Sequence, residues 1–137
     1  MRIVHATSVH PRTDTRIALK MCQSLADEKH NVHLVVADGL GDGSVGNWHI
    51  SDVGQGRGRL RRVVVVARRV ADAALSMQPQ ILHFHDPELL LPLALAPRPA
   101  HTKVIFDVHE NVPAQILGKG YLPWWSRRLM SVGYAAL

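Results

Sequence analysis

The sequence has little cysteine, few aromatic residues and no long apolar run. Cys22 is the only cysteine among 137 residues, which excludes an internal disulfide framework and fits a reducing compartment. No apolar stretch approaches the roughly 20 residues of a membrane span. His, Thr and Arg interrupt the amino-terminal segment too early for the core of a secretory signal. We therefore expect a cytoplasmic protein.

Positive charge exceeds negative charge, with a formal net charge of +5. Half of the arginines lie in one short segment: Arg57, Arg59, Arg61, Arg62, Arg68 and Arg69. Such a stretch suits phosphates, anionic lipid or nucleic acid, although a solubilising helix face explains it equally well. The chain contains none of the usual nucleic-acid-binding modules, so nucleic acid is not an expected partner.

Apolar patterning predicts strands that alternate with helices. We expect strands at residues 2–7, 31–38, 48–53, 80–85 and 102–109, and a glycine-rich loop after residue 38. Helices are expected from the N-cap Asp14 to about Glu28, over residues 59–77 and over residues 87–96, the last interrupted at Pro92. The order predicts an α/β fold, a Rossmann-like parallel sheet with helices on both faces, in one domain over residues 1–137.

Three polar groups follow predicted strands, where ligands bind in sheets of this kind. In the first group His10, Arg12, Arg16 and Lys20 gather at a junction between a loop and a helix. Side-chain cations beside a helix N-terminus make a suitable anion cradle. Exposed loops often carry arginine for other reasons, so this group is a weak signal by itself.

The second group is HFHDPE, residues 83–88. Asp86 with Pro87 and Glu88 has the pattern of a helix start, with Asp86 as the N-cap. We expect His83 to be a hydrogen-bonded core histidine, because it lies deeper in a strand buried on both faces. His85 lies at the mouth of the strand and is the better functional candidate.

The third group, DVHEN, repeats a histidine followed by an acid one crossover later. A neutral imidazole at His109 could donate to a substrate hydroxyl or accept its proton. Glu110 could equally be a charge in the first turn of a helix. Two such pairs on what could be adjacent strands favour a site over coincidence.

Three stretches together are similar to one known family: HPRTDTRIALKMCQSLADEKHNVHLVVADG, HFHDPELLLPLAL and VIFDVHEN. They resemble the amino-terminal domain of family 4 glycosyltransferases, most closely the bacterial members that build surface polysaccharides. The resemblance implies a GT-B architecture, in which an amino-terminal domain holds the acceptor and a carboxyl-terminal domain holds the nucleotide sugar. The paired glutamates typical of the donor-binding half are absent, so residues 1–137 are expected to be a truncated amino-terminal half that is inactive alone.

The resemblance further implies retaining transfer from a nucleotide-sugar donor to a saccharide acceptor, without a metal or other cofactor. By motif match, His109 reaches toward the transferred sugar and Glu110 helps to shape the site. The substrate-binding residues implied are His10, Arg12, Arg16, Lys20, His85, Asp86 and Glu88. Many relatives carry a Gly-Gly pair in the first loop where this chain has Pro11-Arg12-Thr13, which weakens the case for backbone contact with phosphate there.

Acceptors in this family are often lipid-linked, which gives two segments a further interpretation. The arginines from Arg57 to Arg69, and the aromatic and basic side chains from Trp124 to Arg128, could contact an anionic membrane peripherally. Ordinary packing of Trp124 and Trp125 explains the second segment at least as well.

Two other classes of function stay open at this level. A metal-dependent hydrolase could take ligands from His83, His85, His109 and Glu110. A non-catalytic module could bind anionic lipid or nucleotide through the arginine-rich segment.

Overall fold

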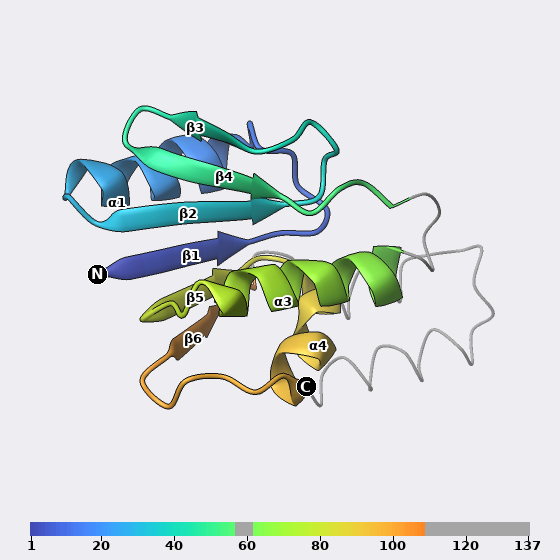
Figure 1. The fold of residues 1–137 in the computed structure, drawn as a ribbon. Helices are drawn as coiled ribbons and strands as arrows, with labels where there is room; N and C mark the ends of the chain where they lie inside the picture. Colours follow the sequence, from blue (N-terminus) through green and yellow to red (C-terminus); the bar gives the residue numbers. More distant parts are fainter. Residues whose placement is uncertain (57–61, 109–137) are drawn as a thin grey trace. The chain divides into compact units, whose positions relative to one another are not determined.

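A six-stranded sheet organises the computed structural model, which describes residues 1–56 and 62–108 (Figure 1). The spatial order is β3-β4-β2-β1-β5-β6. All neighbours are parallel except β3 and β4, which are antiparallel. The strands are β1 (Arg2–Ala6), β2 (Asn31–Val36), β3 (Gly43–Val45), β4 (Trp48–Asp52), β5 (Ile81–Phe84) and β6 (Lys103–Phe106). The parallel strands have the order of a doubly wound Rossmann-like sheet, and the predicted fold class is confirmed.

Helical segments cover both faces of the sheet. The π-helical η1 (Thr15–Cys22) continues into α1 (Gln23–Asp27) on one face. The other face carries η2 (Arg62–Val66), α3 (Ala67–Ser76), η3 (Pro87–Leu89) and α4 (Leu90–Leu95). Figure 1 shows α3 and α1 on opposite sides of the strands. Asp14 is the predicted N-cap of η1, and its carboxylate accepts the N–H groups of Arg16 and Ile17.

Two apolar clusters separate along this division because successive side chains of a strand point to opposite faces. Val4, Leu82 and Phe84 pack with Val70 and Ala74 of α3 on one side. On the other side, the cluster comprises Ile17, Ala18, Cys22, Ala26, Val32, Leu34, Val36, Trp48 and Ile50. The helices on each side of the sheet are thus held by the strand side chains that point to that side.

The glycine-rich segment after β2 differs from the loop that the sequence predicts. Residues Gly43–Val45 form an edge strand, paired with β4 through Val45 and Trp48. Gly46 turns the chain between these strands with φ +54°, a conformation that favours glycine. Only three residues pair in β3, too few for a periodic pattern to appear in the sequence.

The helix predicted over residues 87–96 has two parts. A 3₁₀ turn at Pro87–Leu89 changes to the α-helix Leu90–Leu95 just before Pro92. Proline tolerates the first turn of an α-helix, because an N–H group there has no intrahelical acceptor. The predicted interruption at Pro92 is therefore wrong, because α4 runs through Pro92 and the helix type changes earlier, between Leu89 and Leu90.

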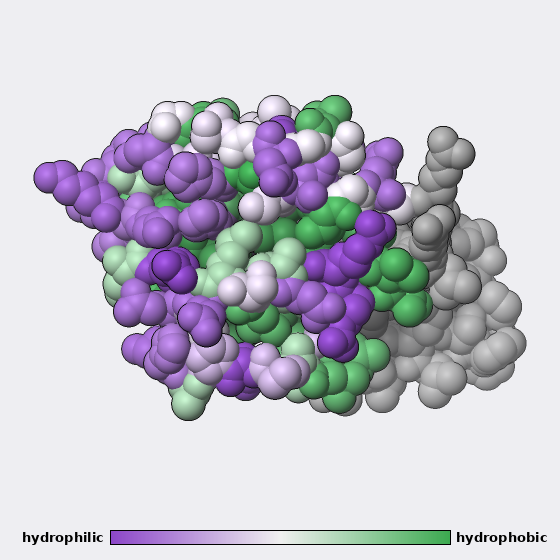
Figure 2. Space-filling model, in the orientation of Figure 1, coloured by the Kyte–Doolittle hydropathy of each residue, from purple (hydrophilic) through white to green (hydrophobic). Residues whose placement is uncertain are grey.

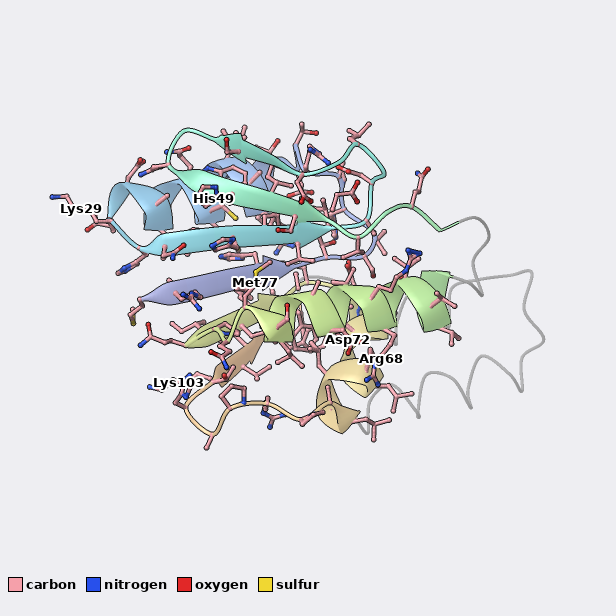
Figure 3. The ribbon with its side chains drawn as sticks, in the orientation of Figure 1. Lys29, His49, Arg68, Asp72, Met77 and Lys103 are labelled. Atoms are coloured by element: carbon pink, nitrogen blue, oxygen red, sulfur yellow. The ribbon has the colours of Figure 1, made fainter. Side chains whose placement is uncertain are left out.

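On the side shown in Figure 2, the described surface is mostly hydrophilic, with patches of hydrophobic side chains among the hydrophilic ones. Within residues 1–56 and 62–108, no helix is both long and apolar enough to cross a bilayer. Part of the arginine-rich segment is balanced by acid, since Arg68 Nε donates to Asp72 Oδ2 at 2.9 Å (Figure 3).

Candidate functional site

The candidate site lies at the carboxyl ends of β1 and β5. These strands are neighbours in space although residues 7–80 separate them in the chain, so the order of the sheet reverses between them. Ligands of open α/β sheets bind at such a reversal, where the loops diverge. The loop after β1 and the start of η3 meet here.

Asp86 joins these two segments. Its Oδ2 accepts the hydroxyl of Thr7 at 2.7 Å, the backbone N–H of Ser8 at 2.6 Å and the backbone N–H of Val9 at 3.2 Å. The residue is 3% exposed. Asp86 stands at the N-cap position of η3 with Pro87 at the start of the helix, as predicted, but its side chain makes no capping hydrogen bond there. The carboxylate binds the loop after β1 instead, because the parallel register brings that loop within reach.

His10 and Glu88 belong to the same cluster of polar side chains as Asp86. Nδ1 of His10 is 3.1 Å from Asp14 Oδ2, and its Nε2 is 3.5 Å from Asp86 Oδ1. Glu88 Oε1 accepts the hydroxyl of Ser8 at 3.2 Å. These residues, predicted to bind substrate, are therefore gathered around one loop.

Arg12 is held by acids of the neighbouring strands. Its Nε and Nη2 donate to the two carboxylate oxygens of Asp38, each at 2.7 Å, and Nη2 also donates to the Gly41 carbonyl at 2.7 Å. The hydrogen bond from Arg12 lowers the pKa of Asp38 below its ordinary value. This bidentate pair ties the first loop to the end of β2. The backbone N–H groups of Ser8 and Val9 likewise donate to Asp86. Several groups of the first loop that could bind an anionic ligand are therefore already bound to carboxylates of the protein.

Arg16 connects the other side of the site. Its Nη1 forms an ion pair with Asp107 Oδ2 at the end of β6. The same oxygen is 3.1 Å from Nδ1 of His85. A line of polar groups therefore runs from η1 through Asp107 to the end of β5.

His85 continues this line inward, with its Nε2 3.1 Å from Nδ1 of His5 on β1. The ring of His83 lies 4.9 Å from His5 and 4.6 Å from His85, between centroids. His5 and His85 are buried and His83 is partly exposed, which reverses the predicted burial of the two histidines of β5. The neighbour of His83 across β6 is the exposed Ile105, whereas Asp107 and His5 enclose His85.

Burial keeps these imidazoles neutral. Burial first, and then the neighbouring His83 and His85, lower the pKa of His5 from 6.5 to about 3. Burial lowers the pKa of His85 to about 4, although Asp107 opposes the shift. The pKa of His83 is lowered as well, again chiefly by burial. Uncharged rings that can donate and accept are therefore present at neutral pH.

A pocket of about 240 Å³ opens beside the loop that follows β1. The segments that follow three strands line it, together with one residue of η2: Ser8, Val9, His10, Pro11, Ala37, Asp38, Gln55, Gly56 and Val66. Such pockets bind ligands through apolar walls and a few well-placed polar groups. Among the predicted site residues, His10 lines this pocket.

Three predicted site residues lie apart from this arrangement or outside the described residues. Lys20 is exposed on η1. His109 and Glu110, the predicted catalytic pair, lie outside the described residues, as do the aromatic and basic residues from Trp124 to Arg128. Their assigned roles stay predictions.

Four further residues of the site escaped the sequence analysis: His5, Thr7, Asp38 and Asp107. His5 is the clearest omission, since a histidine inside the apolar run RIVHA was a visible signal. Asp107 follows β6 directly, and Asp38 stands two positions after the end of β2, as Asp86 does after the end of β5. Their partners lie on other strands and left no local pattern.

One family model matches most of the chain. The model of Glycosyltransferase Family 4 matches residues 15–136. No curated protein and no solved structure matches the chain. The matched range contains η1, the end of β5 and Asp107, and covers most of the sequence. The chain therefore belongs to glycosyltransferase family 4.

Proposed function

We propose that the chain forms the acceptor-side part of an enzyme that transfers a sugar from a nucleotide sugar to a saccharide acceptor. The transfer retains the anomeric configuration and uses no metal at the reacting carbon. The observation that best supports this role is the pocket lined by Ser8, His10, Asp38 and Gln55, at the carboxyl ends of three parallel strands. We propose that a second domain supplies the nucleotide-sugar site.

The chemistry of the pocket suits a saccharide. Hydroxyl, imidazole, carboxylate and amide groups in its wall match a ligand whose hydroxyls both donate and accept hydrogen bonds. Its volume of about 240 Å³ lies below the roughly 300–1,000 Å³ of pockets that enclose a whole drug-sized ligand. We therefore assign the pocket to one sugar residue of the acceptor.

The predicted residues take separate roles in this proposal. His109 orients the transferred sugar, with Glu110 beside it. His10 contacts the acceptor, while Asp86, Glu88 and Arg12 hold the loop that carries His10. Arg16 and Lys20 bind the charged part of the donor. His85 holds Asp107, which in turn holds Arg16.

The acceptor is proposed to be lipid-linked and part of bacterial surface polysaccharide synthesis, on the cytoplasmic side of a membrane. The arginines from Arg57 to Arg69 would then lie near anionic headgroups. In the described part of this segment, Arg68 pairs with Asp72 and Arg69 donates to the Val53 carbonyl at 2.9 Å. Membrane contact would therefore depend more on the remaining arginines.

A transfer assay tests the proposal. The full enzyme is incubated with labelled UDP-, GDP- and dTDP-sugars and lipid-linked saccharide acceptors, and labelled product is measured. We expect one donor class to be used, and His10→Ala to raise the KM for the acceptor about tenfold. His49→Ala, on the exposed side of β4, is the control with unchanged kinetics (Figure 3). Failure to consume any nucleotide sugar, or equal kinetics for His10→Ala and the control, would overturn it.

A further inference from the structure

We propose that His5, His83 and His85 bind a divalent transition-metal ion, with Zn²⁺ as the best match, through one nitrogen of each ring. One ligand atom from each residue lies within 4.8 Å of the others. His5 and His83 are directly paired across β1 and β5, and His85 follows two residues later on the same face. The parallel register therefore places three imidazoles together on one side of the sheet.

The spacing is close to that of a loaded site. Nitrogens bound at about 2.0–2.1 Å in a tetrahedral zinc centre lie roughly 3.4 Å apart. Nδ1 of His5 and Nε2 of His85 are already separated by 3.1 Å. The ligand atom of His83 lies within 4.8 Å of the other two, and rotation of this partly exposed ring would bring it closer. Three histidines with water in the fourth position are an established zinc arrangement.

The hydrogen bonds identify one nitrogen that needs a partner. Asp107 accepts, so His85 donates from Nδ1 and presents a bare Nε2. The proton between His85 Nε2 and His5 Nδ1 must then come from His5. This leaves Nε2 of His5 with a bare lone pair, fully buried and without a hydrogen-bond partner among the described residues. Transfer of the His5 proton from Nδ1 to Nε2 would replace the hydrogen bond between the two rings and leave Nδ1 of His5 and Nε2 of His85 both able to bind one cation.

Asp107 has the position of an outer-shell partner. Metal-binding histidines commonly donate their other ring N–H to a carboxylate, which fixes the tautomer and the ring orientation. Here His85 donates to Asp107, and Arg16 holds the same carboxylate oxygen. Hydrogen bonds therefore connect Arg16 of η1, through Asp107, to the ring of His85.

The ligand type also agrees. Imidazole suits Zn²⁺, Cu²⁺, Ni²⁺ and Fe²⁺ rather than Mg²⁺ or Ca²⁺. The ion would join β1 to β5 beneath the loops of the candidate site. It is assigned to this junction and not to the sugar-transfer step.

Metal titration of the intact chain tests the site. The protein is stripped with a chelator and titrated with Co²⁺, followed by its visible absorption, and with Zn²⁺ in competition with a chromophoric chelator. We expect one equivalent to bind per chain. His83→Ala should weaken binding about 100-fold or more, and Asp107→Asn about 10–100-fold as expected for an outer-shell partner. His49→Ala removes an exposed histidine elsewhere on the sheet and should leave the affinity unchanged.

His83 is the ligand to replace first, because it is partly exposed and its loss disturbs the core least. His83→Gln provides a second variant of similar volume if His83→Ala does not fold, as judged by circular dichroism. No stoichiometric binding to the wild type, or equal affinity in a folded His83 variant, would overturn the site. Unchanged affinity in Asp107→Asn would overturn the role of Asp107.

Discussion

The hydroxyl of Thr7, at the end of β1, donates to the carboxylate of Asp86, at the end of β5, over 2.7 Å. The two residues are 79 positions apart in the chain. The same carboxylate oxygen accepts the backbone N–H groups of Ser8 and Val9. One buried acid thus fixes the loop that lines the candidate acceptor pocket.

Replacing Asp86 should destabilise the protein severely. Asp86→Ala leaves the Ser8 and Val9 N–H groups without their acceptor, and we expect a loss of about 2–4 kcal/mol in the free energy of unfolding. Glu88→Gln keeps an oxygen that can accept the partly buried Ser8 hydroxyl at 3.2 Å and should cost below about 1 kcal/mol. Urea denaturation compares the two variants. Equal midpoints would contradict the central role of Asp86.

The Arg12–Asp38 pair should make stability depend on pH in the acid range. Because Arg12 lowers the pKa of Asp38 below 3.8, the pair adds stability that is fully present above that value. This stability is lost as the pH falls through the depressed pKa and Asp38 takes up a proton. We expect Arg12→Ala to cost roughly 1–2 kcal/mol at pH 7 and to flatten the profile below about pH 4.

Denaturation at several pH values measures this profile, with Arg68→Ala as the matched control. The Arg68–Asp72 pair is about half exposed, with side-chain exposures of 53% and 52%, so its loss should change stability by less than about 0.5 kcal/mol. A control that matched Arg12→Ala would argue against a structural role for Arg12.

Cys22 should be inert toward thiol reagents while the protein is folded. Its side chain is fully buried, and burial raises the pKa of the thiol to about 12. Since the thiolate is the reactive form, iodoacetamide at pH 8 should modify the native protein negligibly and the urea-denatured protein fully. Intact-protein mass spectrometry reads both states. Rapid labelling without denaturant would contradict the packing of Cys22 between η1 and the sheet.

Leu82 tests the core between the sheet and α3. It is fully buried on β5, and Leu82→Ala should destabilise the fold by about 2–5 kcal/mol through lost burial and a residual cavity. Leu91 on α4 is 68% exposed, so Leu91→Ala should have little effect in the same denaturation experiment. Similar losses for both leucines would be inconsistent with the assigned layers.

His109→Ala tests the catalytic assignment that the family resemblance implies. If His109 orients the transferred sugar, turnover of the full enzyme should fall about 100-fold, the scale on which misplacement of a reacting group slows an enzyme. The exposed His101 provides the control, because His101→Ala should leave turnover unchanged. Normal turnover of a folded His109→Ala enzyme would remove this residue from the mechanism.

The sequence determined the features that arise from neighbouring residues. Strand and helix periods gave the α/β class, because side-chain direction repeats every two residues in a strand and every 3.6 in a helix. The Asp14 cap was equally predictable, since its acceptors and donors lie within three residues. Polar residues at the strand ends drew attention to the edge of the sheet where the candidate site lies.

Tertiary structure decided which of those polar residues meet. The order of the strands brought Asp86 to the first loop rather than to its own helix, and it brought His5 to His85 across 80 residues of chain. It also reversed the expected burial of His83 and His85, because the residues that bury or expose each ring belong to other strands. Local patterns carry no record of such partners, since the register and neighbours of a strand are set by packing of the whole sheet.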